Sequence, residues 1–93
     1  MSDPIQADSR PRLAPGCRLS EAPGSEHSLM VPEGILKLTG SGRAIVALCD
    51  GRRTFSEIVA ELSASARGAS EDLIRRESAT FLERLRDRGA MEF

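Results

Sequence analysis

Apolar residues gather in three short runs in the first half of the chain. The runs are Cys17–Leu19, Ser28–Val31 and Ile35–Leu38, and Gly, Pro or charged residues separate them. Short runs between such turn signals are typical of the strands of a small sheet. Because the three runs follow one another closely, they predict an antiparallel three-stranded meander.

Helical spacing begins after the third run. A first helix is expected from about Ser41 to Cys49, with Thr39 as its cap and Gly51 just beyond its end. A second helix follows a capping box, in which Thr54 accepts a hydrogen bond from the backbone of Glu57 and the Glu57 side chain reaches back.

A third helix is expected to start after Ser70, whose hydroxyl suits an N-cap, and to end at Gly89. Its inward stripe comprises Ile74, Ser78, Phe81, Leu82 and Leu85. The last residues, Ala90–Phe93, form a final short strand or simply pack down. Three strands followed by three helices predict a small α+β domain that resembles a winged-helix layout with the sheet placed first.

The first twelve residues differ from the rest. Met1–Arg12 is polar and contains Pro4 and Pro11, so we expect a disordered tail there and one ordered domain over residues 13–93. A chain of 93 residues suits a single modest core. No apolar run approaches the roughly 18 residues of a membrane helix. No signal peptide is visible, so the expected location is the cytoplasm.

Charge argues against nucleic acid as the partner. Thirteen basic and fourteen acidic residues give a net charge of −1, whereas nucleic-acid binders usually carry a basic excess. The third helix does hold five arginines between Arg75 and Arg88, but five carboxylates are mixed among them. Mixed charge is typical of a solvated helix face. DNA binding by a winged helix therefore stays an alternative, to be tested by salt-dependent binding to duplex DNA.

Two residue pairs and one glycine-rich segment are the candidates for catalytic or phosphate-binding chemistry. His27 beside Glu26 is interpreted as an exposed loop histidine, because no nucleophile or metal ligand lies near it in sequence. Cys49 beside Asp50 lacks a base and lies where a helix ends. The glycine-rich segment Gly40–Gly42 lacks the lysine and the spacing of a phosphate-binding loop. The sequence thus predicts a protein that is not an enzyme.

The cysteines are too sparse for a metal centre. Cys17 and Cys49 lie far apart, neither belongs to a CxxC pair, and the chain has one histidine. We expect no metal and no cofactor, and we expect both cysteines to be structural, although a disulfide between them is left open.

The edge of the predicted sheet is the most promising surface for binding a partner. If Ile35–Leu38 lies at an edge, its unpaired backbone groups can accept an extended peptide by β-augmentation, with the third helix as the other wall of a groove. Two alternatives are equally open from the residues alone. The N-terminal tail could cover the edge, or a second copy of the chain could pair with it in a homodimer.

Several segments together resemble the PqqD family of pyrroloquinoline quinone (PQQ) biosynthesis D proteins. The most specific part is the run in which Cys49, Asp50 and Gly51 are followed by Thr54 and then Glu57-Ile-Val. The segments that carry the resemblance are Leu29–Gly34, Leu38–Thr39, Ala44–Thr54, Glu57–Leu62, Phe81–Leu85 and Gly89. The resemblance covers roughly Leu13 to Phe93. It departs from the family at Thr39, where Asn is frequent, and at Ala90, where a larger residue is frequent.

The resemblance implies a non-catalytic peptide chaperone of the kind called a RiPP recognition element, which serves ribosomally made, modified peptides. Such a protein binds the leader of the precursor peptide PqqA and delivers it to the radical SAM enzyme PqqE, which cross-links a glutamate and a tyrosine. A recognition domain for a different modified peptide remains the alternative.

The resemblance also implies where the leader binds, as an added strand against the third helix. The strand positions are Gly34, Ile35, Leu36, Lys37 and Leu38. The helix positions are Arg75, Ser78, Ala79, Leu82 and Arg86. Of these, Arg75 and Arg86 are expected to meet acidic leader residues.

Overall fold

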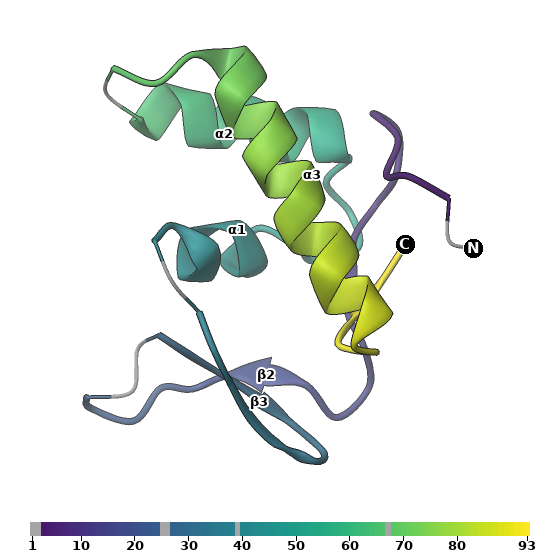
Figure 1. Ribbon diagram of the computed structural model, residues 1–93, viewed down its shortest axis with the longest axis vertical. Coiled ribbons are helices and arrows are strands. Elements are labelled where there is room, and N and C mark those ends of the chain that lie inside the picture. Colours follow the sequence, from purple (N-terminus) through teal and green to yellow (C-terminus); the bar gives the residue numbers. More distant parts are fainter. Residues whose placement is uncertain (1–2, 25–26, 39, 67) are drawn as a thin grey trace.

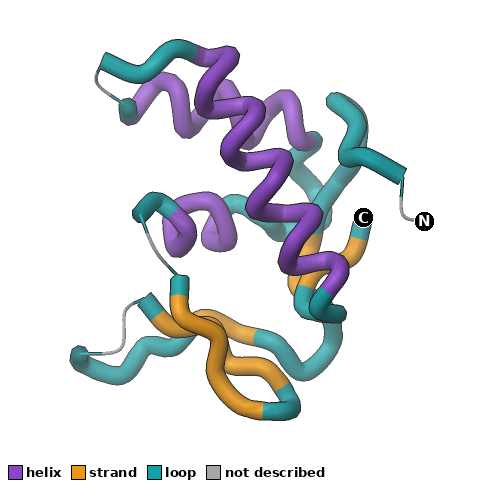
Figure 2. The backbone as a smooth tube through the Cα atoms, in the orientation of Figure 1, coloured by secondary structure: helices purple, strands orange, loops and turns teal. Residues whose placement is uncertain are grey.

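The computed structural model describes residues 3–24, 27–38, 40–66 and 68–93. The strands are β1 (Arg12–Leu13), β2 (Arg18–Leu19), β3 (Ser28–Val31), β4 (Gly34–Lys37) and β5 (Met91–Glu92), and the helices are α1 (Gly42–Ala47), α2 (Phe55–Ser65) and α3 (Glu71–Asp87). Figure 1 shows α1 between the β2–β3–β4 sheet and the pair formed by α2 and α3. The smooth trace in Figure 2 shows the sheet at one end and α2 at the other, with α3 running diagonally from beside α2 past α1 toward the sheet.

The main sheet is the predicted antiparallel meander, with the strand order β2-β3-β4. Its central row runs from Leu19 through Leu29 to Leu36. Leu29 is completely buried and Leu36 half-buried, so this row faces the helices. Side chains alternate across a strand, and the neighbouring row, which includes Met30 and Ile35, therefore lies on the outer face.

Local capping fixes where the two longer helices begin. At the start of α2, Thr54 Oγ1 accepts from the Glu57 backbone N–H at 3.1 Å, and Glu57 Oε1 accepts from the Thr54 backbone N–H at 2.9 Å. At the start of α3, Ser70 Oγ accepts from the Leu73 N–H at 3.1 Å. Both predicted caps are confirmed. The cap expected at Thr39 lies outside the described residues, and the N-cap of α1 is Ser41, whose side chain makes no capping bond.

The core joins all the main elements. The predicted inward stripe of α3 is confirmed, since Ser78, Leu82 and Leu85 are buried and Ile74 and Phe81 are half-buried. The buried apolar residues of the central cluster are Leu29, Leu38, Ile45, Val46, Cys49, Phe55, Ile58, Val59, Leu82, Leu85, Ala90 and Met91. The core is therefore almost entirely aliphatic, as the scarcity of aromatic residues requires.

The N-terminal segment differs from the expected disordered tail, because residues 3–12 pack along α2 and α3. The carbonyl oxygens of Ser9 and Ala7 accept from the backbone N–H groups of Phe55 and Ser56 at 2.7 and 3.0 Å. Thr54 accepts from the third amide of this turn, that of Glu57. All three N–H groups, which have no partner within the helix, are thus hydrogen-bonded. The tail prediction rested on polar composition, whereas these contacts use backbone oxygens that every residue has.

The two chain ends meet in a second, two-stranded sheet. Strand β1 pairs antiparallel with β5, so that Arg12 lies opposite Glu92 and Leu13 opposite Met91. The Arg12 guanidinium and the Glu92 carboxylate form an ion pair at 3.0 Å. The final strand was one of two outcomes left open by the sequence, and its partner strand was not foreseen.

Neither cysteine is in a disulfide: Cys17 is half-buried, Cys49 is buried, and both are free thiols. Among the residues that the structure describes, no helix combines the length and the apolar character needed to cross a membrane.

Candidate peptide-binding site

The outer edge of β4 presents unpaired backbone groups. Across the β3–β4 hairpin the Leu38 N–H donates to the His27 carbonyl oxygen at 2.6 Å. Because hydrogen-bonding direction alternates along an antiparallel strand, Leu36 also turns its backbone groups toward β3, while Ile35 and Lys37 turn theirs away. Within the described ranges no strand pairs with β4 on that outer side. Two N–H and two C=O groups are therefore available for another strand.

A groove separates this strand from the C-terminal half of α3. It encloses about 420 Å³. Its lining consists of Ile35, Leu36, Lys37, Leu38, Phe81, Arg84, Leu85 and Arg88. The edge of β4 thus borders a channel whose opposite wall is a helix, as an added strand would require.

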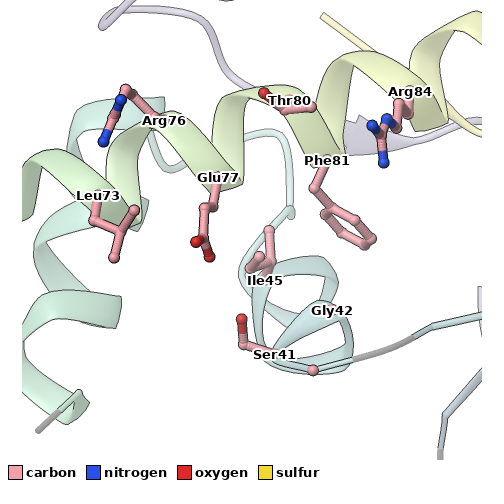
Figure 3. A pocket seen from close by; sticks show the side chains of 10 residues that line it. Ser41, Gly42, Ile45, Leu73, Arg76, Glu77, Thr80, Phe81 and Arg84 are labelled. Atoms are coloured by element: carbon pink, nitrogen blue, oxygen red, sulfur yellow. The ribbon is translucent and has the colours of Figure 1, made fainter. Parts of the chain in front are cut away.

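The groove continues past the end of β4 toward the start of α1. This second stretch encloses about 670 Å³ and shares Phe81 and Arg84 with the first. Figure 3 shows the Phe81 ring extending from α3 toward α1, with Leu73 and Glu77 pointing the same way from earlier turns of the helix. Ile45 of α1 faces them from below. We call the two stretches together the β4–α3 groove.

Residues of β4 and of α3 line opposite sides of this groove, and the α3 residues named from the sequence lie elsewhere on the helix. Ser78 is 2% exposed and Leu82 is completely buried, so both belong to the core and neither is available to a peptide. Arg75 pairs with Glu71 at 2.7 Å on the exposed surface of the helix. Arg75 and Ala79 line a different hollow, beside the N-terminal segment and Phe55. These four residues do not line the β4–α3 groove.

Arg86 also faces away from the groove. Its guanidinium carbon lies 4.3 Å from the centre of the Phe93 ring, and it donates a hydrogen bond to the Asp3 carbonyl oxygen. The helix side of the groove is instead lined by Phe81 and Arg84 of α3 and by its C-cap, Arg88. These residues lie on the face of the helix next to the one that carries the buried Ser78 and Leu82. Phe81 was recognised only as part of the apolar stripe. Its place at one margin of that stripe is the sequence signal that could have pointed to the groove.

The residues weighed as catalytic groups are placed unfavourably for catalysis. Burial, and then the neighbouring Asp50 carboxylate, raise the pKa of the Cys49 thiol to about 12, so it stays protonated at neutral pH. His27 is exposed in a loop. Over the described ranges no three His, Cys, Asp or Glu side chains gather as a metal site.

The glycine-rich start of α1 serves close packing. A Cβ at Gly42 would lie 3.1 Å from both Leu38 Cβ and Phe81 Cζ, so this position allows α1 to approach both walls of the groove. This contact explains a glycine here without a phosphate ligand.

Known proteins share both the sequence pattern and the fold of this chain. A sequence profile of coenzyme PQQ synthesis protein D (PqqD) matches residues 26–90. This chain belongs to the PqqD family. The PqqA binding protein of Stutzerimonas stutzeri is 38% identical over 74 residues, which cover 75% of this chain and 80% of the relative. The PqqA binding protein of Azotobacter vinelandii is 37% identical over 83 residues, covering 88% of each chain.

A solved PqqD structure has the same fold. The solution NMR structure of the PqqD truncation of Methylobacterium extorquens PqqCD aligns with a TM-score of 0.80 at 27% identity, over 96% of this chain and 95% of that one. That protein is a functional, stand-alone RiPP recognition element. The α+β fold inferred from the sequence is thus the fold of the PqqD family.

Proposed function

We propose that this PqqD-family chain is a non-catalytic chaperone that binds the precursor peptide PqqA as an added strand on the outer edge of β4 and presents it to the radical SAM enzyme PqqE. The observation that carries the proposal is the unpaired backbone of Ile35 and Lys37, facing a groove whose other wall is α3. The names of the relatives, PqqA binding proteins, support PqqA as the peptide. The expected setting is the cytoplasm.

Backbone pairing and side-chain contacts have different roles in this proposal. Pairing with Ile35 and Lys37 supplies up to four hydrogen bonds at about 0.5–1.5 kcal/mol net each. Such bonds hold any extended chain and do not read its sequence. Contacts with Phe81 and the basic residues of α3 supply the selection, since they depend on which side chains the peptide turns toward the helix.

A titration tests the proposal. Synthetic PqqA is added to ¹⁵N-labelled protein while backbone amide shifts are followed, with a scrambled PqqA and a DNA duplex at low salt as controls. We expect the largest shifts at Ile35, Lys37, Phe81 and Arg84, and no saturable shifts with the controls. Shifts confined to the N-terminal segment would contradict the proposed site. Saturation by the duplex would favour the winged-helix alternative instead.

Two further outcomes are informative. Tight binding of the leader of another ribosomally made peptide, with PqqA weak, would reassign the substrate within the same class. Sedimentation of the free protein as a dimer that dissociates when PqqA is added would indicate that a second copy pairs with β4 in the absence of peptide.

A further inference from the structure

Three basic side chains line the β4–α3 groove beside β4 without a protein partner. Several arginines outside it are engaged: Arg12 with Glu92, Arg53 with Asp50 and Glu61, and Arg75 with Glu71. Arg10 and Arg86 donate to backbone carbonyl oxygens. Lys37, Arg84 and Arg88 form no ion pair or hydrogen bond through their side chains with any described residue, and all three line the groove.

The stretch of groove beside β4 is therefore strongly positive. Its lining holds these three cations and no carboxylate. The one acidic residue along the whole β4–α3 groove, Glu77, lies on the stretch that faces α1. The helix does carry Glu83 and Asp87 close by, but neither lines the groove, and Glu83 accepts from the Ile5 N–H at 3.0 Å on the side of the N-terminal segment. A chain with net charge −1 thus presents a local positive surface where the peptide is proposed to lie.

The spacing of the two arginines matches that of a strand. Arg84 in the last turn of α3 and Arg88, the residue that caps its C-terminus, are four residues apart, which places their backbones about 6 Å apart along the helix axis. Alternate residues of a strand share a face and lie about 6.6–6.8 Å apart. A peptide paired with β4 would therefore bring two side chains at positions i and i+2 opposite the two guanidinium groups.

We infer that Arg84 and Arg88 select a peptide with carboxylates at two alternate positions of the added strand, an acidic-x-acidic pattern on the face turned toward α3. Lys37 adds to the positive potential at the margin of the same stretch. This inference rests on the proposed strand addition and deepens it: the backbone of β4 holds the peptide, and the two guanidinium groups choose it by charge-assisted hydrogen bonds.

Three versions of synthetic PqqA test the inference. The two alternate residues that face α3, located from the amide titration, are both Glu, both Gln or both Lys. We expect the Glu version to bind about tenfold more tightly than the Gln version, as two partly solvated ion pairs allow, and the Lys version to bind most weakly. Added NaCl should narrow the difference between the Glu and Gln versions.

Paired variants separate local contact from overall charge. The R84Q/R88Q double variant should bind the Glu and Gln peptides equally. The R18Q/R52Q variant loses the same charge at exposed positions outside the groove and should keep the tenfold preference. Thermal unfolding checks that both variants fold. A preference that persists in R84Q/R88Q, while the peptide still shifts the amides of Ile35 and Lys37, would overturn the inference and leave strand addition intact. Binding that spares those amides altogether would overturn both.

Discussion

Gly42 packs closely against the ring of Phe81: a Cβ built there would be 3.1 Å from Phe81 Cζ, so even a methyl group would require the ring to shift. The same Cβ would lie 3.1 Å from Leu38 Cβ. One glycine therefore sets the distance between the start of α1, the end of β4 and the aromatic wall of the groove.

Replacing Gly42 by Val should displace the Phe81 ring and weaken peptide binding. Overpacking a fitted site costs about 1–3 kcal/mol of unfolding free energy. Urea unfolding measures this cost, and ring proton shifts report the position of Phe81. Ala47→Val is the matched control, because it adds a similar side chain to the same helix at an exposed position outside the groove. Unchanged ring shifts in Gly42→Val would show that the contact does not position Phe81.

The amide of Lys37 can be removed without breaking the hairpin. Lys37→Pro deletes an N–H that points away from β3, so the protein should fold, while its affinity for PqqA should fall at least about fivefold. Lys37→Ala keeps the amide and removes the charge, and therefore isolates the backbone contribution. If Lys37→Pro and Lys37→Ala bind PqqA equally well, the N–H of Lys37 is not used.

Removing residues 1–9 should destabilise the protein while sparing the peptide site. The deletion removes the carbonyl oxygens that cap Phe55 and Ser56, and the half-buried Ile5. We expect a loss of about 1–3 kcal/mol in unfolding free energy and faster exchange at those two amides. Affinity for PqqA should stay within about twofold, since this segment does not line the β4–α3 groove. Loss of binding in a folded deletion variant would place the segment in the site.

The capping box predicts part of the stability profile in acid. The pKa of Glu57 lies below its ordinary value of 4.5, chiefly because the Thr54 backbone N–H donates to its carboxylate. A depressed folded-state pKa stabilises the protein above the unfolded value, and the contribution is lost as pH falls through the folded value. Glu57→Gln should therefore show a smaller drop in unfolding free energy between about pH 6 and about pH 3 than the parent chain.

The exposed Glu21→Gln, in the loop after β2, is the control for that comparison and should keep the full acid dependence. If the unfolding free energy of Glu57→Gln falls in acid as much as that of the parent chain, the Glu57 carboxylate does not contribute to the pH dependence of stability.

What the sequence could predict depended on how local each feature is. The caps at Thr54 and Ser70 and the hairpin around Pro32 are set within a few residues, and the structure has all of them. The N-terminal segment could not be foreseen, because its carbonyl oxygens cap a helix more than forty residues away. Polarity and proline content carry no information on such contacts.

The strand side of the candidate site was predictable from the sequence, whereas the helix side was not. A three-stranded meander has two edges, so Ile35–Leu38 was expected to lie at one, and the strand order β2-β3-β4 places β4 there. The facing residues of α3 depend on how the helix crosses the sheet, which is a property of the packed core. The stripe that includes Ser78, Leu82 and Leu85 turns inward, and the groove is reached by the neighbouring face at Phe81, Arg84 and Arg88. Periodicity gave the inward face but not which margin of it borders β4.

Hydrogen exchange at four consecutive amides tests strand addition most directly. In the free protein Leu36 and Leu38 should be protected by β3, while Ile35 and Lys37 should exchange rapidly. Saturating PqqA should slow exchange at Ile35 and Lys37 and change Leu36 and Leu38 little. Rapid exchange at Ile35 and Lys37 in the fully bound protein would contradict the account.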